Sequence, residues 1–155
     1  MSTPTDRFFY QKHEMLAIAN AQGFQVSDGL FEDWKEKGLI GEADEQIWPG
    51  RGAGSGSIAL WSQPHLDLFL RILAYRQRES NPAHIGPLCK LPVHRWLYYG
   101  DAGGVDLPQV KRAMDTWTKY QQNITEERRR VQLHYLVVEL KNVVKLSSND
   151  CVSTV

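Results

Sequence analysis

The sequence predicts a mainly α-helical fold, and three observations lead to this prediction. Apolar residues recur at helical spacing along the chain, most regularly in residues 63–78 and 125–146. A short helical segment at residues 28–37 precedes a glycine-rich loop at residues 50–57, and the apolar residues 58–61 follow that loop. A short helix followed by a flexible loop and a return strand is the outline of a winged helix-turn-helix, here with additional C-terminal helices.

Composition narrows the class of protein. Of the 155 residues, 42% are apolar, which is enough for a packed core without metal or disulfide support. Cys89 and Cys151 have no metal-ligand spacing, and free thiols are typical of a reducing compartment. The N terminus is polar, and no segment approaches the roughly 18 apolar residues of a membrane span. We therefore expect a cytoplasmic protein without membrane, metal or cofactor.

The first two helices are expected from their capping residues. Thr5 and Asp6 can cap a helix that runs to about Ala21 and closes at Gly23. Ser27 is a suitable N-cap for a second helix, which Gly38 ends. The inward face of this second helix is expected to carry Leu30, Phe31 and Trp34.

A loop, a strand and a third helix are expected next. Residues 50–57 contain four glycines in eight positions, so regular structure is disfavoured there. Residues 57–61 are expected to form a return strand. Ser62 and Pro64 then begin a helix that ends near Arg78. We take residues 5–78 as the winged helix-turn-helix domain.

The remainder divides into a connecting segment and a helical region. Residues 79–106 are rich in proline and glycine, so we expect mostly loop with short helical turns, and residues 96–99 packed against the core. In residues 107–147 we expect one helix to about Gln122, a break at residues 123–125, and a last helix to about Leu146.

The last helix carries an apolar stripe that predicts a homodimer. The stripe follows a 3, 4, 3 spacing and consists of Leu133, Leu136, Val137, Leu140, Val143 and Val144. A stripe on one helix looks the same whether it pairs two subunits or packs on its own subunit. Both interpretations therefore stay open.

Residues 26–41, VSDGLFEDWKEKGLIG, resemble the recognition segment of MerR-type winged-helix regulators. The shared features are the Val-Ser start, an aromatic residue at Trp34, and Gly38 followed by leucine. The family's wing then leads into an aromatic residue, here Trp61, and a helix with equivalents of Leu66 and Ile72. The resemblance covers about residues 12–77 and implies a scaffold that binds duplex DNA.

The departures from this family limit what the resemblance implies. Glu32 and Ala59 stand where the family has arginines in its recognition helix and wing. The proline-rich segment replaces the second helix-turn-helix that normally follows the wing. Effector-binding and metal-binding functions are therefore not carried over.

Seven residues are candidates for DNA contact. Lys35 and Lys37 are expected on the outward side of the second helix, and Arg51 at the loop tip can meet a phosphate or enter the minor groove. Serine hydroxyls could bond phosphate, and an arginine after the wing could add positive charge. The complete set is Ser27, Lys35, Lys37, Arg51, Ser55, Ser57 and Arg71.

Charge leaves a second interpretation open. The 18 basic residues equal the 18 acidic ones, and residues 1–80 carry 8 basic against 11 acidic residues. Lys35 and Lys37 could simply pair with Asp33 and Glu36 on a solvated face. The alternative to a DNA-binding protein is then a protein-interaction module whose acidic helix binds a basic partner.

Catalysis has little support in the sequence. No phosphate-binding loop, nucleophile elbow or dinucleotide fingerprint is present. His65 is expected at a helix surface or boundary, and His84 and His94 lie without a metal-ligand pattern. We therefore expect no catalytic residues.

Overall fold

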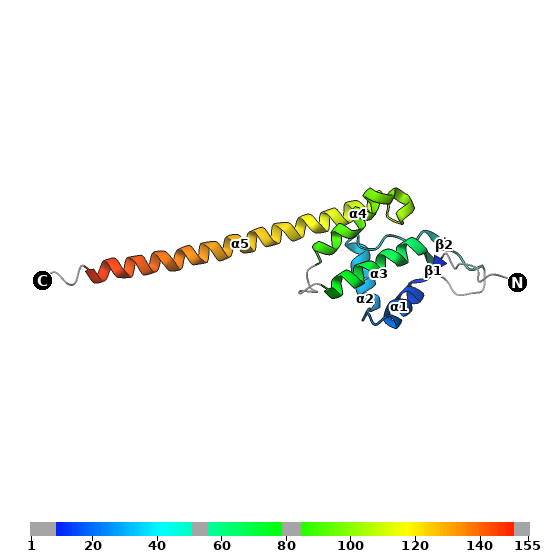
Figure 1. The fold of residues 1–155 in the computed structure, drawn as a ribbon, viewed down its shortest axis with the longest axis horizontal. Helices are drawn as coiled ribbons and strands as arrows, with labels where there is room; N and C mark the ends of the chain where they lie inside the picture. The colour runs from blue at the N-terminus through cyan, green and yellow to red at the C-terminus, as the bar shows by residue number, and fades with distance from the viewer. Residues whose placement is uncertain (1–8, 51–55, 79–84, 151–155) are drawn as a thin grey trace. The chain divides into compact units, whose positions relative to one another are not determined.

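The computed structural model describes residues 9–50, 56–78 and 85–150, with side chains to residue 145. The chain divides into unit 1, Met1–Thr118, and unit 2, Lys119–Val155. The secondary structure is mainly helical with a small antiparallel sheet (Figure 1). None of the helices within the described ranges is long and apolar enough to cross a bilayer.

The elements follow one another in a simple order. Those of the N-terminal half are β1 (Phe9–Tyr10), α1 (Lys12–Ala21), α2 (Asp28–Glu36), β2 (Glu45–Ile47), β3 (Ile58–Ser62) and α3 (Gln63–Arg78). Those of the C-terminal half are the 3-10 turn η1 (Pro87–Cys89), α4 (Lys90–Tyr99), the 3-10 turn η2 (Gly100–Gly103) and α5 (Leu107–Asp150).

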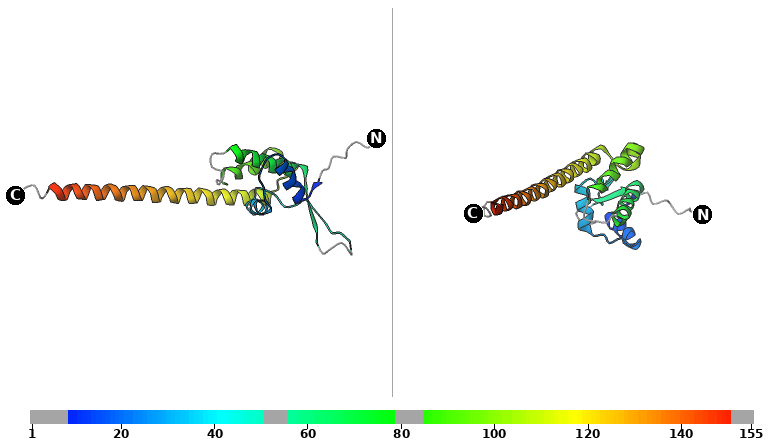
Figure 2. Two further views of the ribbon diagram at one scale, coloured as in Figure 1. Left: turned by 90° about the horizontal axis from the view of Figure 1, so that it is seen from below. Right: turned by 60° about the vertical axis from the view of Figure 1, so that its left-hand side comes forward.

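The sheet has β3 at its centre. Its order is β1-β3-β2, and both pairings are antiparallel. Tyr10 lies opposite Trp61, and Gln46 lies opposite Ala59. Figure 2 shows β2 and β3 side by side as a hairpin. The return strand was predicted, whereas its partner β2 was not. Residues 45–47 lack the alternation of apolar and polar side chains that indicates a strand.

The first helix begins later than predicted. Residues 5 and 6 lie outside the described residues, and α1 starts at Lys12. Phe9 and Tyr10 are extended because they pair with β3, and Gln11 has extended backbone as the N-cap. The backbone N–H of Gln11 donates to the Glu14 carboxylate at 2.9 Å, so this pair marks the helix start.

The segment 79–106 was expected to be mostly loop with short helical turns, but its described part, residues 85–106, is more helical than predicted. It contains the ten-residue helix α4. Pro92 is the third residue of α4, where the N–H it lacks would have no partner within the helix, so proline is tolerated there. Of the aromatic run, only Trp96 packs against the core, because consecutive residues of a helix face different directions. Tyr98 and Tyr99 are exposed.

The predicted break at residues 123–125 is also absent. Helix α5 is continuous from Leu107 to Asp150. The hydroxyl of Thr125 donates to the carbonyl of Gln121 at 2.9 Å, so its hydrogen bond is made inside the helix. A threonine used in this way accompanies a helix rather than ending it.

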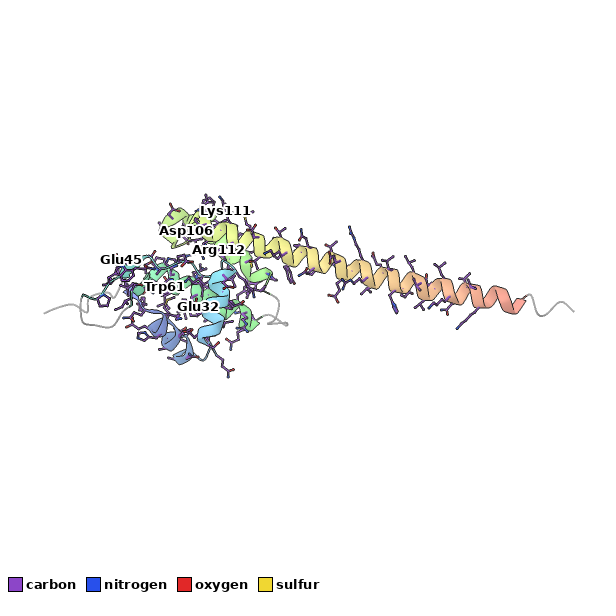
Figure 3. All side chains as sticks on the ribbon, turned by 180° about the vertical axis from the view of Figure 1, so that it is seen from behind. Glu32, Glu45, Trp61, Asp106, Lys111 and Arg112 are labelled. Atoms are coloured by element: carbon purple, nitrogen blue, oxygen red, sulfur yellow. The ribbon has the colours of Figure 1, made fainter. Side chains whose placement is uncertain are left out.

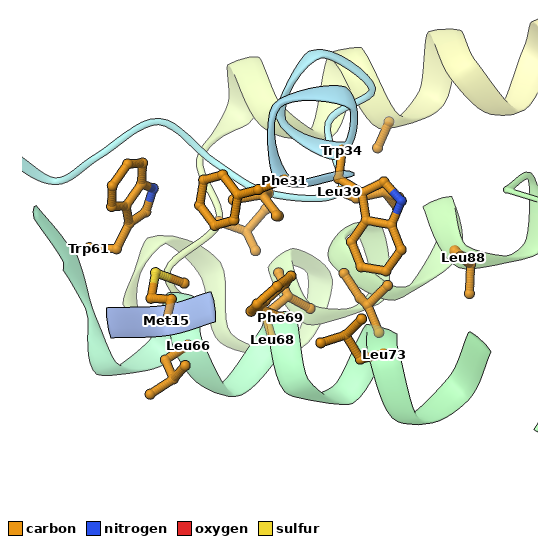
Figure 4. Packing of buried hydrophobic residues seen from close by; sticks show 14 of the residues in the cluster. Met15, Phe31, Trp34, Leu39, Trp61, Leu66, Leu68, Phe69, Leu73 and Leu88 are labelled. Atoms are coloured by element: carbon orange, nitrogen blue, oxygen red, sulfur yellow. The ribbon is translucent and has the colours of Figure 1, made fainter. Parts of the chain in front are cut away.

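The core of unit 1 is built on edge-to-face aromatic contacts. The Phe31 ring lies 5.3 Å from that of Trp61 and 5.6 Å from that of Phe69, while the Trp34 ring lies 6.1 Å from that of Phe69. These side chains join α2, β3 and α3 (Figure 4). The predicted inward face of α2 is confirmed for Phe31 and Trp34, which are buried, and Leu30 is partly buried.

The burial of Trp34 predicts a large cost for its removal. Trp34→Ala should lower the free energy of unfolding by about 3–5 kcal/mol, because the cavity it leaves lies between α2 and α3. Trp48→Ala is the matched control, since Trp48 is 73% exposed. Urea denaturation of both variants measures the difference, and equal stabilities would contradict the position of Trp34 in the core.

Candidate nucleic-acid interface

Helix α2 begins at the predicted cap. Ser27 has extended backbone, and its Oγ accepts the N–H of Leu30 at 3.2 Å. The N-cap role is therefore confirmed. A hydroxyl oxygen that accepts in this way can still donate its own hydrogen to a phosphate oxygen.

The two candidate lysines of this region form ion pairs. Lys37 Nζ lies 2.8 Å from Asp33, four residues earlier, and Lys35 Nζ lies 3.2 Å from Glu42. Of the expected partners Asp33 and Glu36, Asp33 pairs with Lys37, while Lys35 pairs with Glu42 rather than Glu36. Both pairs are partly exposed, so each can open at a small cost when a phosphate competes.

A third lysine neutralises the start of α2. Lys12 Nζ on α1 lies 2.8 Å from both Asp28 Oδ1 and Glu32 Oε1 (Glu32 is labelled in Figure 3). The hydrogen bonds that the Lys12 ammonium donates to the carboxylates of Asp28 and Glu32 raise its pKa above its usual 10.5. Sequence reasoning missed Lys12, because this contact joins two helices and leaves no local spacing pattern.

The charges around α2 still sum to a negative value. Three lysines meet four carboxylates in these pairs, and Glu36 adds a further exposed carboxylate. A negatively charged protein surface repels DNA phosphates, unless its carboxylates face the DNA bases rather than the sugar-phosphate backbone. Phosphate contacts therefore have to come largely from other elements.

A carboxylate anchors the base of the hairpin. Asp44, next to β2, accepts the backbone N–H of Ser62 at 2.7 Å, and its other oxygen lies 3.1 Å from His65 Nε2. Burial favours a raised pKa for Asp44, but the Ser62 hydrogen bond and the nearby His65 outweigh it, so the pKa lies below its usual 3.8. His65 lies in the first turn of α3, at the predicted helix boundary, but its side chain is buried rather than at the surface.

The residues between α2 and β2 are held from two sides. The indole N–H of Trp61 donates to the carbonyl of Gly41 at 3.0 Å, and the side-chain amide of Gln109 donates to the carbonyl of Leu39 at 3.2 Å. Thr116 Oγ1 donates to the carbonyl of Lys37 at 2.9 Å. We call residues 37–44 the junction. It positions the hairpin relative to α2.

The structure places the hairpin candidates only in part. Ser57 is exposed immediately before β3, as a phosphate contact requires. Arg51 and Ser55 lie outside the described residues. The sequence analysis missed Trp48, whose large exposed side chain follows β2.

Arg71 does not join the candidates on α2. It is exposed on α3 and lines a cavity together with Leu91, Arg95 and Tyr99 from α4. The seven candidates therefore fall into separate groups, on α2 and its junction, on the hairpin, and on α3. No cluster of three or more histidine, cysteine or acidic side chains able to hold a metal occurs among the described residues.

Comparisons with protein-family models, with curated proteins and with solved structures found no match.

The Asp44 contacts predict a pH-dependent contribution to stability. Because its pKa is lowered in the folded state, Asp44 stabilises the fold above pH 3.8, and this contribution is lost as the pH falls through the lowered pKa. Asp44→Asn should therefore lower the melting temperature at pH 7, and the difference from wild type should shrink below about pH 4.

Asp115→Asn is the control for this experiment, because Asp115 is exposed on α5. It should melt like wild type at both pH values. A stability difference for Asp44→Asn that stays constant from pH 7 to the acid range would contradict the assigned role of this carboxylate.

Proposed function

We propose that this protein binds double-stranded DNA through a winged helix-turn-helix formed by α1, α2 and the β2–β3 hairpin. One observation supports this proposal most strongly. Helix α2 is followed by an antiparallel hairpin of the same unit, and the junction between them is held by Trp61, Gln109 and Thr116. A helix with an adjoining hairpin can enter a groove of duplex DNA while the hairpin contacts the flanking sugar-phosphate backbone.

Helix α2 would enter the major groove. Its exposed acids can accept hydrogen bonds from cytosine amino groups, and the Ser27 hydroxyl can donate to a phosphate. Lys35, near the end of α2, and Lys37, the first residue of the junction, can exchange their partly exposed carboxylate partners for phosphates. The salt bridges from Lys12 reduce the repulsion between Asp28 or Glu32 and the DNA.

The hairpin would hold the DNA backbone. Arg51, between β2 and β3 in the sequence, supplies a charge that can enter the minor groove or meet a phosphate, with Ser55 and Ser57 as hydrogen-bond donors. Arg71, on α3, would contact a phosphate of the DNA outside the stretch of major groove that α2 would contact.

Two copies of the chain would bind together. Within unit 2, the stripe residues from Leu133 to Val144 are each more than two fifths exposed, and Figure 3 shows the side chains projecting from the helix. A pair of such helices would cover these stripes and would space two DNA half-sites. A dimeric DNA-binding protein of this kind would regulate transcription or organise a DNA segment.

One observation favours a second function. The charge around α2 stays negative after all its ion pairs are formed. Such a helix would suit a basic protein partner, which makes a protein-interaction module the alternative. This alternative predicts no salt-dependent affinity for duplex DNA.

Fluorescence anisotropy with labelled random-sequence duplex separates the two functions. The full chain should bind, and its affinity should fall steeply with salt because phosphate contacts release counterions. Arg51→Ala should weaken binding to many sequences and reduce the salt slope by about one. Lys111→Ala is the control, because this exposed α5 lysine (Figure 3) is outside the proposed interface. Absence of binding at low salt would contradict DNA binding.

Sedimentation tests the dimer. Leu136→Glu with Leu140→Glu should give folded monomers, because charges in a helix pair's apolar seam oppose association. Tyr135→Glu with Asn142→Glu, both exposed on the other side of the helix, should leave the dimer intact. A wild-type chain that is monomeric at micromolar concentration would refute dimerisation, and an unfolded double glutamate variant would indicate that the stripe packs within its own subunit.

A further inference from the structure

A cavity of about 330 Å³ lies between α3 and α4, away from the α2 candidates. Leu68 and Leu91 supply its apolar side chains, while His94, Tyr98 and Tyr99 line it from α4. Two guanidinium groups, those of Arg71 and Arg95, complete the lining. Its volume is at the lower end of the range for small-molecule sites, which suits a ligand of one or two rings.

Arg95 is held in place by its own unit. Its Nε donates to the carbonyl of Gly103 at 2.6 Å, and its guanidinium carbon lies 5.7 Å from the centre of the Tyr99 ring. A guanidinium fixed through Nε and a ring face keeps its terminal N–H groups in one orientation. This preorganisation lowers the entropy lost when an anion binds.

In the part of the chain that the structure describes, no carboxylate lines the cavity beside its two guanidinium groups. Among the described residues, no acidic oxygen forms an ion pair with Arg71 or Arg95, and the residues that line the cavity include no acid. A second hollow shares Arg71, Arg95 and Tyr99 with the first, and it is this second hollow that Asp67 lines. An anion is therefore favoured in the first cavity.

The apolar surface at this place is also larger than α4 needs for folding. Tyr98 and Tyr99 both line the cavity and are exposed, and Tyr98 is 84% exposed. Tyrosine side chains at the rim of a concave site can stack on a planar ring, while the leucines contact its edge. The site combines apolar side chains with two guanidinium groups. This combination matches a ligand that has an aromatic ring system and a carboxylate.

We propose that the cavity between α3 and α4 binds a small aromatic carboxylate. The carboxylate receives N–H bonds from Arg71 and Arg95, and the ring lies against Leu68, Leu91 and Tyr98. This binding does not depend on the proposed DNA function, because none of the cavity residues except Arg71 belongs to that interface.

Equilibrium dialysis of the full chain with 2-naphthoate tests this site in the absence of DNA. We expect 2-naphthoate to bind at least about tenfold more tightly than the neutral isostere 2-naphthalenemethanol, because charge-assisted hydrogen bonds discriminate between them. Tyr98→Ala should weaken the binding of both probes, since it removes ring contact. Lys111→Gln, an exposed lysine that does not line the cavity, should leave the affinity for naphthoate unchanged.

Two arginine variants make the test decisive. Arg95→Gln and Arg71→Gln should each weaken naphthoate binding about tenfold while leaving 2-naphthalenemethanol unaffected. Arg95→Gln can also loosen the contact with Gly103, whereas exposed Arg71 forms no such hydrogen bond with the residues that the structure describes. Equal affinity for the two probes, wild-type affinity in Arg71→Gln, or no naphthoate binding at millimolar concentration would each overturn the proposal.

Discussion

The close approach of the α5 backbone to Gly38 is the constraint on which the arrangement of unit 1 depends. Gly38 has φ +80°, and a Cβ there would lie 2.7 Å from the carbonyl oxygen of Gln109. Glycine is needed both for this conformation and for this spacing. The contact lets the buried Gln109 amide reach the Leu39 carbonyl and lets Thr116 reach the Lys37 carbonyl.

This constraint links helix α2 to the hairpin. A second close approach occurs at Gly41, where a Cβ would lie 2.6 Å from Gln109 Oε1 and 2.8 Å from His65 Cε1. The Gly41 carbonyl is thereby available to the Trp61 indole, and Trp61 also packs on Phe31. The same few residues thus end α2, begin the hairpin and contact the core. The two parts of the proposed DNA interface are consequently positioned by one junction.

The sequence predicted what depends on local chemistry. The Ser27 cap, the buried Phe31 and Trp34, and the strand and helix after the glycine loop were all confirmed. The features that were not predicted depend on contacts between residues far apart in the sequence. Pairing with β3 extends residues 9 and 10, and the partners of Lys12 and His65 lie on other elements. Helix α4 was missed because proline was interpreted as a breaker although it occupies the first turn.

The central claim is that α2 and the β2–β3 hairpin bind duplex DNA together, and amide chemical-shift mapping tests it most directly. We would record the amide spectrum of the full chain at low salt while adding a random-sequence duplex. Amide shifts should grow together in residues 27–37 and in the hairpin strands, while the amides of buried α3 residues change little. Shifts confined to α4, or none in α2 and the hairpin at saturating DNA, would contradict it.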